Sequence, residues 1–246
     1  MMRPRQLMRL WRVRTIASAF RSGVAALLCA ASNLAAPVAA AQDLQGEIPT
    51  GVYALDPTHA TLKFSVRHMG LSNYYANFAL VDCFILVAEP VSALQTRCVT
   101  TVNSVFTAYN RLGPKFADRD WDRELATHEG LLNADAHPYA TFESRRVERI
   151  GPNRLRISGP LTLVGIAQPV SFDVEILGAL AEHPFAKVPA FGLSARTSFV
   201  RSAYGMSFLA PQVVGDAVSL SLDADFTKVE QSRLPSLADM IASASR

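Results

Sequence analysis

A short segment near the start of the chain alternates strictly between apolar and polar side chains. Leu62, Phe64 and Val66 are apolar, and a polar residue follows each of them. Successive side chains of a β-strand point to opposite faces, so this segment is predicted to be a strand with one buried and one solvated face. Asp56-Pro57 predicts a turn before the strand, because proline fixes φ and has no N–H, and Met69-Gly70 predicts a break after it.

The same alternation recurs through the rest of the chain and predicts about seven or eight strands, with no regular alternation of strands and helices. Strands with one buried face in this number form a sandwich or a closed barrel. Closure removes the exposed edges of the sheet, and eight strands leave room inside for side chains or one elongated ligand. We therefore predict an all-β, antiparallel eight-stranded barrel over residues 51–228. The further strands are expected at 77–88, 93–106, 154–163, 170–176, 191–199 and 218–226.

Two segments have helical spacing instead. Residues 118–132 place Trp121 and Leu125 on one side and predict a short helical insertion. Its acidic residues are interleaved with Arg119 and Arg123, which is typical of a solvated helix with local ion pairs. Residues 229–246 form a C-terminal tail in which a short, fraying helix is expected.

The first 41 residues have the composition of a secretory signal peptide. They contain six arginines, no acidic residue, the apolar run 24–31 and Ala39-Ala40-Ala41 before Gln42. Cleavage near Ala41 predicts a periplasmic or secreted protein that begins with a linker at 42–50, although an uncleaved anchor or a transit peptide stays open. The whole chain has a net charge of +3, but without the leader 18 basic residues face 21 acidic ones. A nucleic-acid partner is therefore not expected.

Two cysteines remain after the leader, Cys83 and Cys98. If strands over 77–88 and 93–106 are joined by a turn at 89–92, residues whose numbers sum to 181 lie opposite each other, and the two cysteines are such a pair. An exported chain meets an oxidising compartment, where this pair can form a disulfide across the hairpin. Two free, half-buried thiols are the alternative.

The sequence has none of the common catalytic or phosphate-binding motifs, and no metal site is expected. His59 and His68 are nine residues apart, so on one regular strand they would face opposite sides and could not share a metal ion. His68 lies at a strand end, where it would stand at the mouth of a cavity or be satisfied by backbone and water. Arg201 and Tyr204 follow another strand, and Arg201 is either a site for an anionic head group or an ordinary surface arginine.

Several segments together resemble the YceI-like polyisoprenoid-binding family. They occur in family order from about residue 51 to 228, although Trp121 and Glu124 stand where many members have Arg and His, which puts any polar contact made by those residues in doubt. The resemblance implies a lipocalin-like barrel, secreted or periplasmic, that binds a long isoprenoid or other amphiphilic chain. The matching segments are Asp56-Pro57-Thr58-His59, His68-Met69-Gly70, Trp121–Leu125, Tyr139–Ser144, Gly159–Gly165, Phe191–Ala195, Arg201–Met206 and Val214–Val218.

These observations predict an exported carrier or sequestering protein, not an enzyme, that needs no cofactor and holds an isoprenoid or fatty-acyl ligand, with a quinone among the candidates. His68, Arg201 and Tyr204 are predicted at the mouth. Transient membrane contact and a homodimer are left open. The alternatives are an enzyme that uses His68, Asp122 or Arg201 on a small amphiphile, and a stress-related partner-binding module with a filled core. The predicted cavity lining is Leu62, Phe64, Val66, Phe78, Phe142, Leu161, Leu163, Phe172, Val174, Phe199, Leu220 and Leu222.

Overall fold

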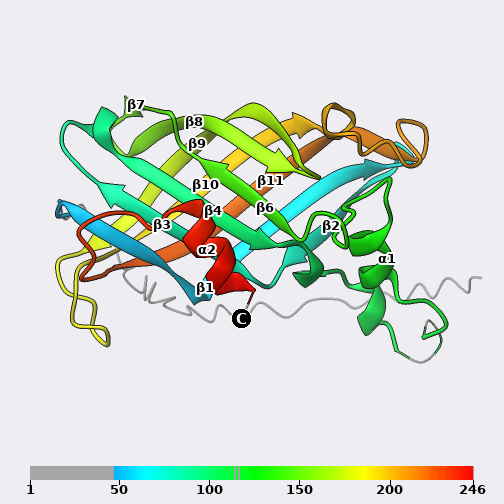
Figure 1. Ribbon diagram of the computed structural model, residues 1–246, viewed down its shortest axis with the longest axis horizontal. Helices are drawn as coiled ribbons and strands as arrows, with labels where there is room; N and C mark the ends of the chain where they lie inside the picture. The colour runs from blue at the N-terminus through cyan, green and yellow to red at the C-terminus, as the bar shows by residue number, and fades with distance from the viewer. Residues whose placement is uncertain (1–46, 114, 116, 246) are drawn as a thin grey trace, which may run out of the picture. The chain divides into compact units, whose positions relative to one another are not determined.

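The computed structural model describes residues 47–113, 115 and 117–245, shown as a ribbon in Figure 1. The predicted leader and most of the linker lie outside the described residues. The described strands are β1 (Gly51–His68), β2 (Ser72–Phe78), β3 (Val81–Val87), β4 (Gln95–Thr101), β5 (Val105–Phe106), β6 (Tyr139–Glu143), β7 (Arg146–Gly151), β8 (Arg154–Leu163), β9 (Ile166–Leu180), β10 (Ala190–Val200) and β11 (Val214–Lys228).

The sheet closes because β1 pairs with β11, the last strand of the chain, as well as with β2 and β3. The order around the ring is β1, β3, β4, β6, β8, β9, β10 and β11, and neighbouring strands are antiparallel. β2 continues the position of β3 along β1, and β7 continues that of β6 along β8. The prediction of a closed antiparallel eight-stranded barrel is thus confirmed, with its strands in sequence order.

The predicted turn at Asp56-Pro57 is wrong, because β1 runs through it. The register between β1 and β11 steps from Leu55 opposite Phe226 to Ala60 opposite Ala224, so the intervening residues form a bulge. Within the bulge the Asp56 carboxylate accepts hydrogen bonds from the backbone N–H and the hydroxyl of Thr58 (2.8 and 2.6 Å). These local hydrogen bonds give the backbone N–H of Thr58 a partner where the pairing between β1 and β11 is interrupted.

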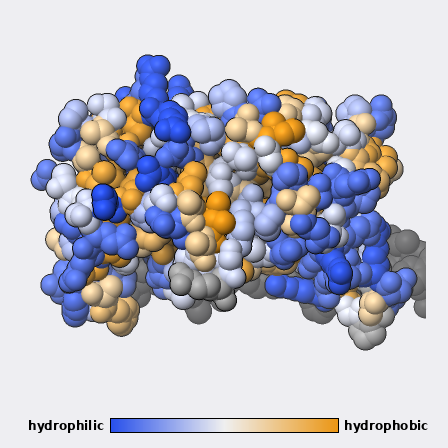
Figure 2. Space-filling view, in the orientation of Figure 1, coloured by the Kyte–Doolittle hydropathy of each residue, from blue (hydrophilic) through white to orange (hydrophobic). Residues whose placement is uncertain are grey.

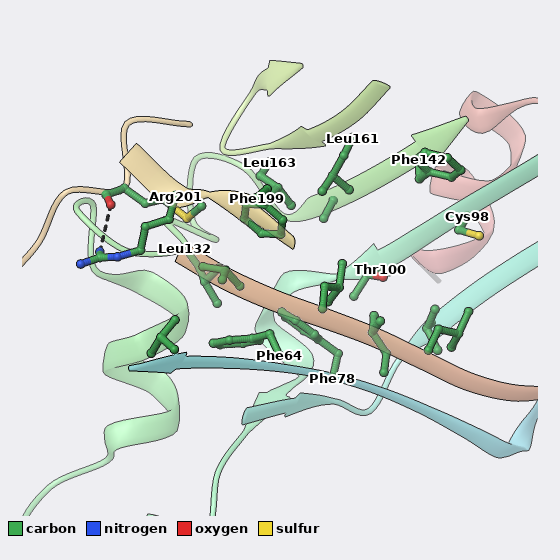
Figure 3. Close-up of a pocket in the computed structure, with 18 of the residues that line it drawn as sticks. Phe64, Phe78, Cys98, Thr100, Leu132, Phe142, Leu161, Leu163, Phe199 and Arg201 are labelled. Carbon is green, nitrogen blue, oxygen red and sulfur yellow. Dashed lines mark hydrogen bonds between the residues drawn. The ribbon is translucent and has the colours of Figure 1, made fainter. Parts of the chain in front are cut away.

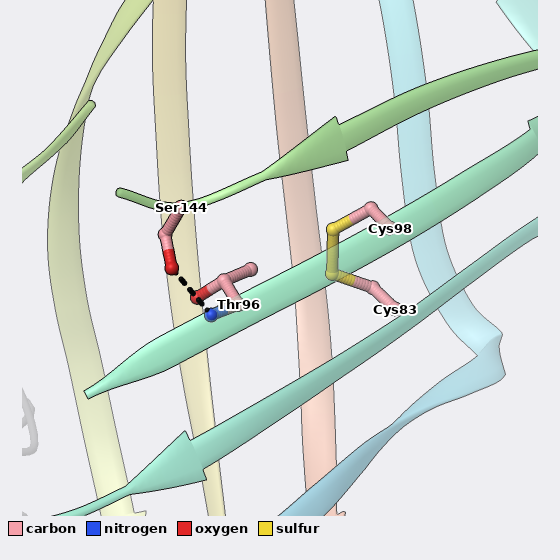
Figure 4. Close-up of a disulfide and its surroundings, with 4 residues drawn as sticks. All are labelled: Cys83, Thr96, Cys98 and Ser144. Carbon is pink, nitrogen blue, oxygen red and sulfur yellow. Dashed lines mark hydrogen bonds between the residues drawn. A yellow bond between two sulfur atoms is a disulfide. The ribbon is translucent and has the colours of Figure 1, made fainter. Parts of the chain in front are cut away.

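The predicted strand over 77–88 is two strands, since β2 ends at Phe78 and β3 begins at Val81. Between them the backbone N–H of Leu80 donates to the Ser104 hydroxyl, and its carbonyl accepts from Thr101. The register of β3 and β4 is as predicted. Cys83 lies opposite Cys98, and the two form a disulfide (Figure 4).

The two α-helices among the described residues are short. α1 (Trp121–Thr127) covers less than the predicted 118–132, and Asp120 caps its N-terminus by accepting from the N–H of Arg123. α2 (Leu237–Ala244) begins with a capping box between Ser236 and Asp239 and buries Met240. None of the described helices is long and apolar enough to cross a membrane.

Gly159 explains how β8 changes partner from β7 to β6. Gly159 and Pro160 both pair regularly with β9. On the other side, a Cβ at Gly159 would lie 2.0 Å from the carbonyl oxygen of Glu143, so only glycine permits this close approach. Figure 2 shows mostly hydrophilic side chains on one outer face of the barrel, as the alternation of the strands requires.

Candidate ligand-binding cavity

The barrel encloses a cavity of about 660 Å³, lined by side chains from its strands and from the segments at one end (Figure 3). This volume lies in the range of cavities that bind small ligands. The filled core of the partner-binding alternative is therefore not what the structure contains.

The inward faces of the strands form most of the wall. All twelve residues predicted as lining lie on it: Leu62, Phe64, Val66, Phe78, Phe142, Leu161, Leu163, Phe172, Val174, Phe199, Leu220 and Leu222. That they contact a ligand stays a prediction. The wall also includes apolar side chains from outside the regular strands, which strand periodicity could not reveal: Leu125, Leu131, Leu132, Met206, Phe208, Leu209 and Val213.

Three aromatic rings close one end of the barrel. Phe226 lines the cavity, stacks on Phe191 with ring centroids 5.4 Å apart, and is fully buried. Tyr53 meets Phe191 edge to face at 5.0 Å and donates its hydroxyl to the carbonyl of Pro49 (2.8 Å). Burial raises the pKa of Tyr53 to about 12. We call these three rings the aromatic plug.

The opposite end forms the mouth, where β1 ends at His68, which is exposed and lines the cavity. The indole Nε1 of Trp121 donates to the Tyr74 hydroxyl at 2.6 Å, and both residues belong to the wall. The Arg119 guanidinium lies 4.4 Å from the centre of the Trp121 ring and pairs with Glu124. This hydrogen bonding raises the pKa of Arg119 and lowers that of Glu124. Trp121, Tyr74 and Arg119 were not predicted as wall residues.

Arg201 lines the cavity, but its guanidinium is already engaged. It is 4 % exposed, and it donates four hydrogen bonds of 2.9 Å to backbone carbonyls. Desolvation lowers its pKa. Arg201 therefore ties its loop to the start of β11, and little of it is left for a ligand head group. The four acceptors are Met206, Phe208, Val214 and Gly215.

Tyr204 does not line the cavity, contrary to its predicted place at the mouth. It is buried, packs edge to face on Phe199 with ring centroids 5.3 Å apart, and has a pKa raised to about 12 by burial. Tyr204 is the last residue of the short helical turn Arg201–Tyr204 and belongs to the buried hydrophobic core.

The candidates for an enzymatic mouth are not gathered into one reactive group. The Asp122 carboxylate accepts from the N–H and hydroxyl of Thr107 (2.9 and 2.6 Å), which fixes α1 against the chain after β5. The guanidinium of Arg201 is already bonded to the four backbone carbonyls described above. Among the residues that the structure describes, no group of three or more His, Cys, Asp and Glu side chains could hold a metal ion.

The comparison with known proteins agrees with this architecture. Residues 53–226 match the model of the YceI-like domain. The chain belongs to the YceI-like family. It is 34% identical over 121 residues to a UPF0312 protein of Pectobacterium carotovorum, and 33% identical over 121 residues to Protein YceI of Salmonella arizonae. These matches cover 49% of this chain and 57% and 58% of those proteins, so the chain spans a little over half the length of the curated relatives it matches.

Solved structures with low sequence identity share the fold. BcnA of Burkholderia cenocepacia matches with a TM-score of 0.58 at 17% identity, over 70% of this chain and 98% of that one. A polyisoprenoid binding domain from Saccharophagus degradans matches with a TM-score of 0.52 at 13% identity, over 72% and 98%. At such identities the likeness concerns the fold alone.

Proposed function

We propose that this protein holds one long apolar chain, a polyisoprenoid or similar amphiphilic lipid, inside the barrel. The observation that carries the proposal is a cavity of about 660 Å³ whose lining is almost entirely aliphatic and aromatic, plugged at one end and open at the other. The polyisoprenoid binding domain of similar fold supports the choice of ligand class.

The energetics of such binding need no precise polar contact. Burying one CH₂ group contributes up to about 0.8 kcal/mol, so one isoprene unit contributes on the order of 4 kcal/mol before the entropic cost of binding. A few units in an apolar tunnel suffice for tight binding. The proposed role is that of a carrier or sequestering protein.

The rim of the mouth supports contact with a lipid surface during loading. Met69 and Leu71 lie in the turn after β1, and Leu209 lies in the loop before β11. The N–H of Met69 joins these two segments by donating to the carbonyl of Val213. Met69 is 55 %, Leu71 82 % and Leu209 47 % exposed. Leu209 also lines the cavity, so the exposed apolar rim is continuous with the interior wall.

Export is part of the proposal and rests on the sequence of residues 1–41, which lie outside the described residues. A disulfide between Cys83 and Cys98 suits an oxidising compartment. A homodimer stays a prediction.

Native mass spectrometry of the protein purified from a bacterial periplasm tests the proposal directly. We expect a co-purifying mass of a long-chain lipid, identified after solvent extraction, and uptake of prenyl and fatty-acyl fluorescent probes once that lipid is removed. Delipidated protein that keeps its fold and takes up neither probe would show that the proposal is wrong.

A further inference from the structure

One residue of the cavity wall has a fully buried hydroxyl oxygen without a hydrogen-bond partner. Thr96 is 6 % exposed and lines the cavity, and its Oγ1 finds no partner among the described residues. The backbone N–H and C=O of Thr96 are both hydrogen-bonded. The N–H donates to the Ser144 hydroxyl (2.8 Å; Figure 4), and the carbonyl accepts from the N–H of Ser144 (2.9 Å). Buried polar groups are nearly always hydrogen-bonded, so a lone buried hydroxyl requires an explanation.

The strand register places Thr96 at the plugged end of the barrel. Thr96 lies opposite Ile85 on β3, and Ile85 lies opposite Tyr53 of the aromatic plug on β1. Along the same inward face of β4, Cys98 and then Thr100 follow toward the mouth. Thr96 therefore lies at the deep end of the cavity, beyond the disulfide, with its Oγ1 buried in the wall.

The charged side chains of the cavity wall lie at the mouth, the end opposite Thr96. Among the lining residues, the charged or titratable cationic side chains are His68, Arg119 and Arg201, and all three lie at the mouth. The lining contains no Lys, Asp or Glu. A carboxylate or phosphate carried to the depth of Thr96 would lie in an apolar environment without a compensating charge, which is strongly unfavourable.

We propose that Thr96 is a ligand-binding residue that recognises a neutral oxygen, a hydroxyl or carbonyl, at the end of the lipid chain that enters first. The inference rests on the proposed function and adds the orientation and chemical class of the ligand. Rotation about the Thr96 Cα–Cβ bond exchanges Oγ1 with the methyl group, and the hydroxyl then donates to, or accepts from, this oxygen. The chain extends past the disulfide toward the mouth.

Displacement of a bound fluorescent fatty-acyl probe by farnesol and by farnesene tests this, since the two differ chiefly in the terminal hydroxyl. Thr96→Val, which replaces the hydroxyl with a methyl group, is expected to weaken farnesol binding about fivefold, the value of one hydrogen bond, and to leave farnesene binding unchanged. Thr96→Ser keeps the hydroxyl and should retain farnesol affinity. Thr61→Val, which makes the same change on the exposed outer side of β1, is the matched control and should change neither ligand.

The stability of Thr96→Val without ligand provides a second measurement. Removing an unpartnered buried hydroxyl should leave the urea midpoint of Thr96→Val equal to or above that of the native chain. Farnesoic acid at neutral pH should bind the native chain at least about tenfold more weakly than farnesol, because its carboxylate cannot enter the deep end.

The outcomes separate the two proposals. If the native chain binds none of these molecules, the lipid-binding function fails and this inference fails with it. If the native chain binds farnesol and farnesene but Thr96→Val binds both as well as before, the function stands and the role of Thr96 is wrong. A marked loss of stability in Thr96→Val would also overturn the inference, since the hydroxyl would then have a partner within the protein.

Discussion

Cys83 and Cys98 lie directly opposite each other on β3 and β4, and their disulfide forms part of the cavity wall. The bridge joins strands that are already hydrogen-bonded neighbours, and it closes a loop with a sequence separation of 15. It therefore acts mainly on the unfolded chain, by limiting the conformations available to the hairpin.

Replacing both cysteines, Cys83→Ala with Cys98→Ala, is expected to lower the free energy of unfolding by about 3 kcal/mol, the chain-entropy value for a loop of this length. Urea denaturation followed by circular dichroism measures the change. Dithiothreitol should destabilise the native chain by a similar amount and leave the double variant unaffected. A native chain with the same urea midpoint in both conditions would contradict a stabilising disulfide.

The period of two along the chain was sufficient to predict the barrel and the residues of its wall. Alternation determines which side chains face inward wherever a strand is regular, so Phe172, Val174 and Leu222 could be placed without coordinates. The removal of exposed sheet edges favoured closure over a sandwich, and the family resemblance implied the same barrel. The disulfide followed from the same logic, because the register of one hairpin places Cys83 opposite Cys98.

What the sequence could not supply comes from contacts between distant or irregular segments. The bulge after Leu55 is held by side-chain bonds of Asp56, whereas the dipeptide Asp56-Pro57 alone reads as a turn. Trp121 at the mouth depends on a hydrogen bond to Tyr74, 47 positions away. The hydrogen bonds from Arg201 to backbone carbonyls could not be inferred either, because an arginine that follows a strand can face either solvent or the backbone of another segment.

Arg201→Lys is expected to lower the free energy of unfolding by about 3 kcal/mol, since one ammonium group cannot reach four carbonyls in the plane that the guanidinium serves. Thermal and urea denaturation measure the effect. Arg196→Lys is the matched control, because the Arg196 side chain is 68% exposed and its nearest carboxylate oxygen, on Asp223, is 3.8 Å away. Equal stability of the two variants would mean that the Arg201 network is not formed in solution.

Asp56 and His59 are expected to titrate as a pair. Hydrogen bonds from Thr58 and His59 lower the pKa of Asp56 to about 2, and the bond to Asp56 raises the pKa of His59. The Asp56 contribution to stability is present above its unfolded value of about 3.9 and is lost as pH falls toward 2. The His59 contribution is present below its unfolded value of about 6.5 and is lost as pH rises through the raised folded pKa.

Asp56→Asn should therefore shift the His59 titration, followed by the NMR signals of the imidazole, to a lower pH. Asp225→Asn is the control, because Asp225 makes only the smallest contribution to the raised pKa of His59, and its shift should be clearly smaller. An unchanged His59 titration in Asp56→Asn would show that the 2.8 Å contact is not maintained.

The exposed rim is expected to govern exchange with membranes. Leu71→Ser combined with Leu209→Ser should slow transfer of a fluorescent prenyl probe to phosphatidylethanolamine–phosphatidylglycerol vesicles on the order of a hundredfold. Each leucine loses about 1.5 kcal/mol of apolar burial, and about 1.4 kcal/mol corresponds to a factor of ten. Phe185→Ser is the matched control. This residue is 89% exposed and lies in the loop between β9 and β10, at the plugged end. Equal slowing by Phe185→Ser would indicate general surface hydrophobicity instead of a rim.

Filling the cavity from its wall should abolish binding while the barrel stays folded. Ala195 lies on the inward face of β10, is buried and lines the cavity, so the ring of Ala195→Phe would project into the space proposed for the lipid. Probe affinity should fall at least about tenfold, since several CH₂ groups lose their site. Ser198→Phe adds the same ring on the exposed outer side of the strand and should bind the probe as the native chain does.

The urea midpoint of Ala195→Phe shows whether the cavity is open. A ring that enters an open cavity avoids the overpacking cost of about 1–3 kcal/mol that a filled core imposes. Native-like stability with unchanged binding in Ala195→Phe would place the ligand elsewhere on the protein.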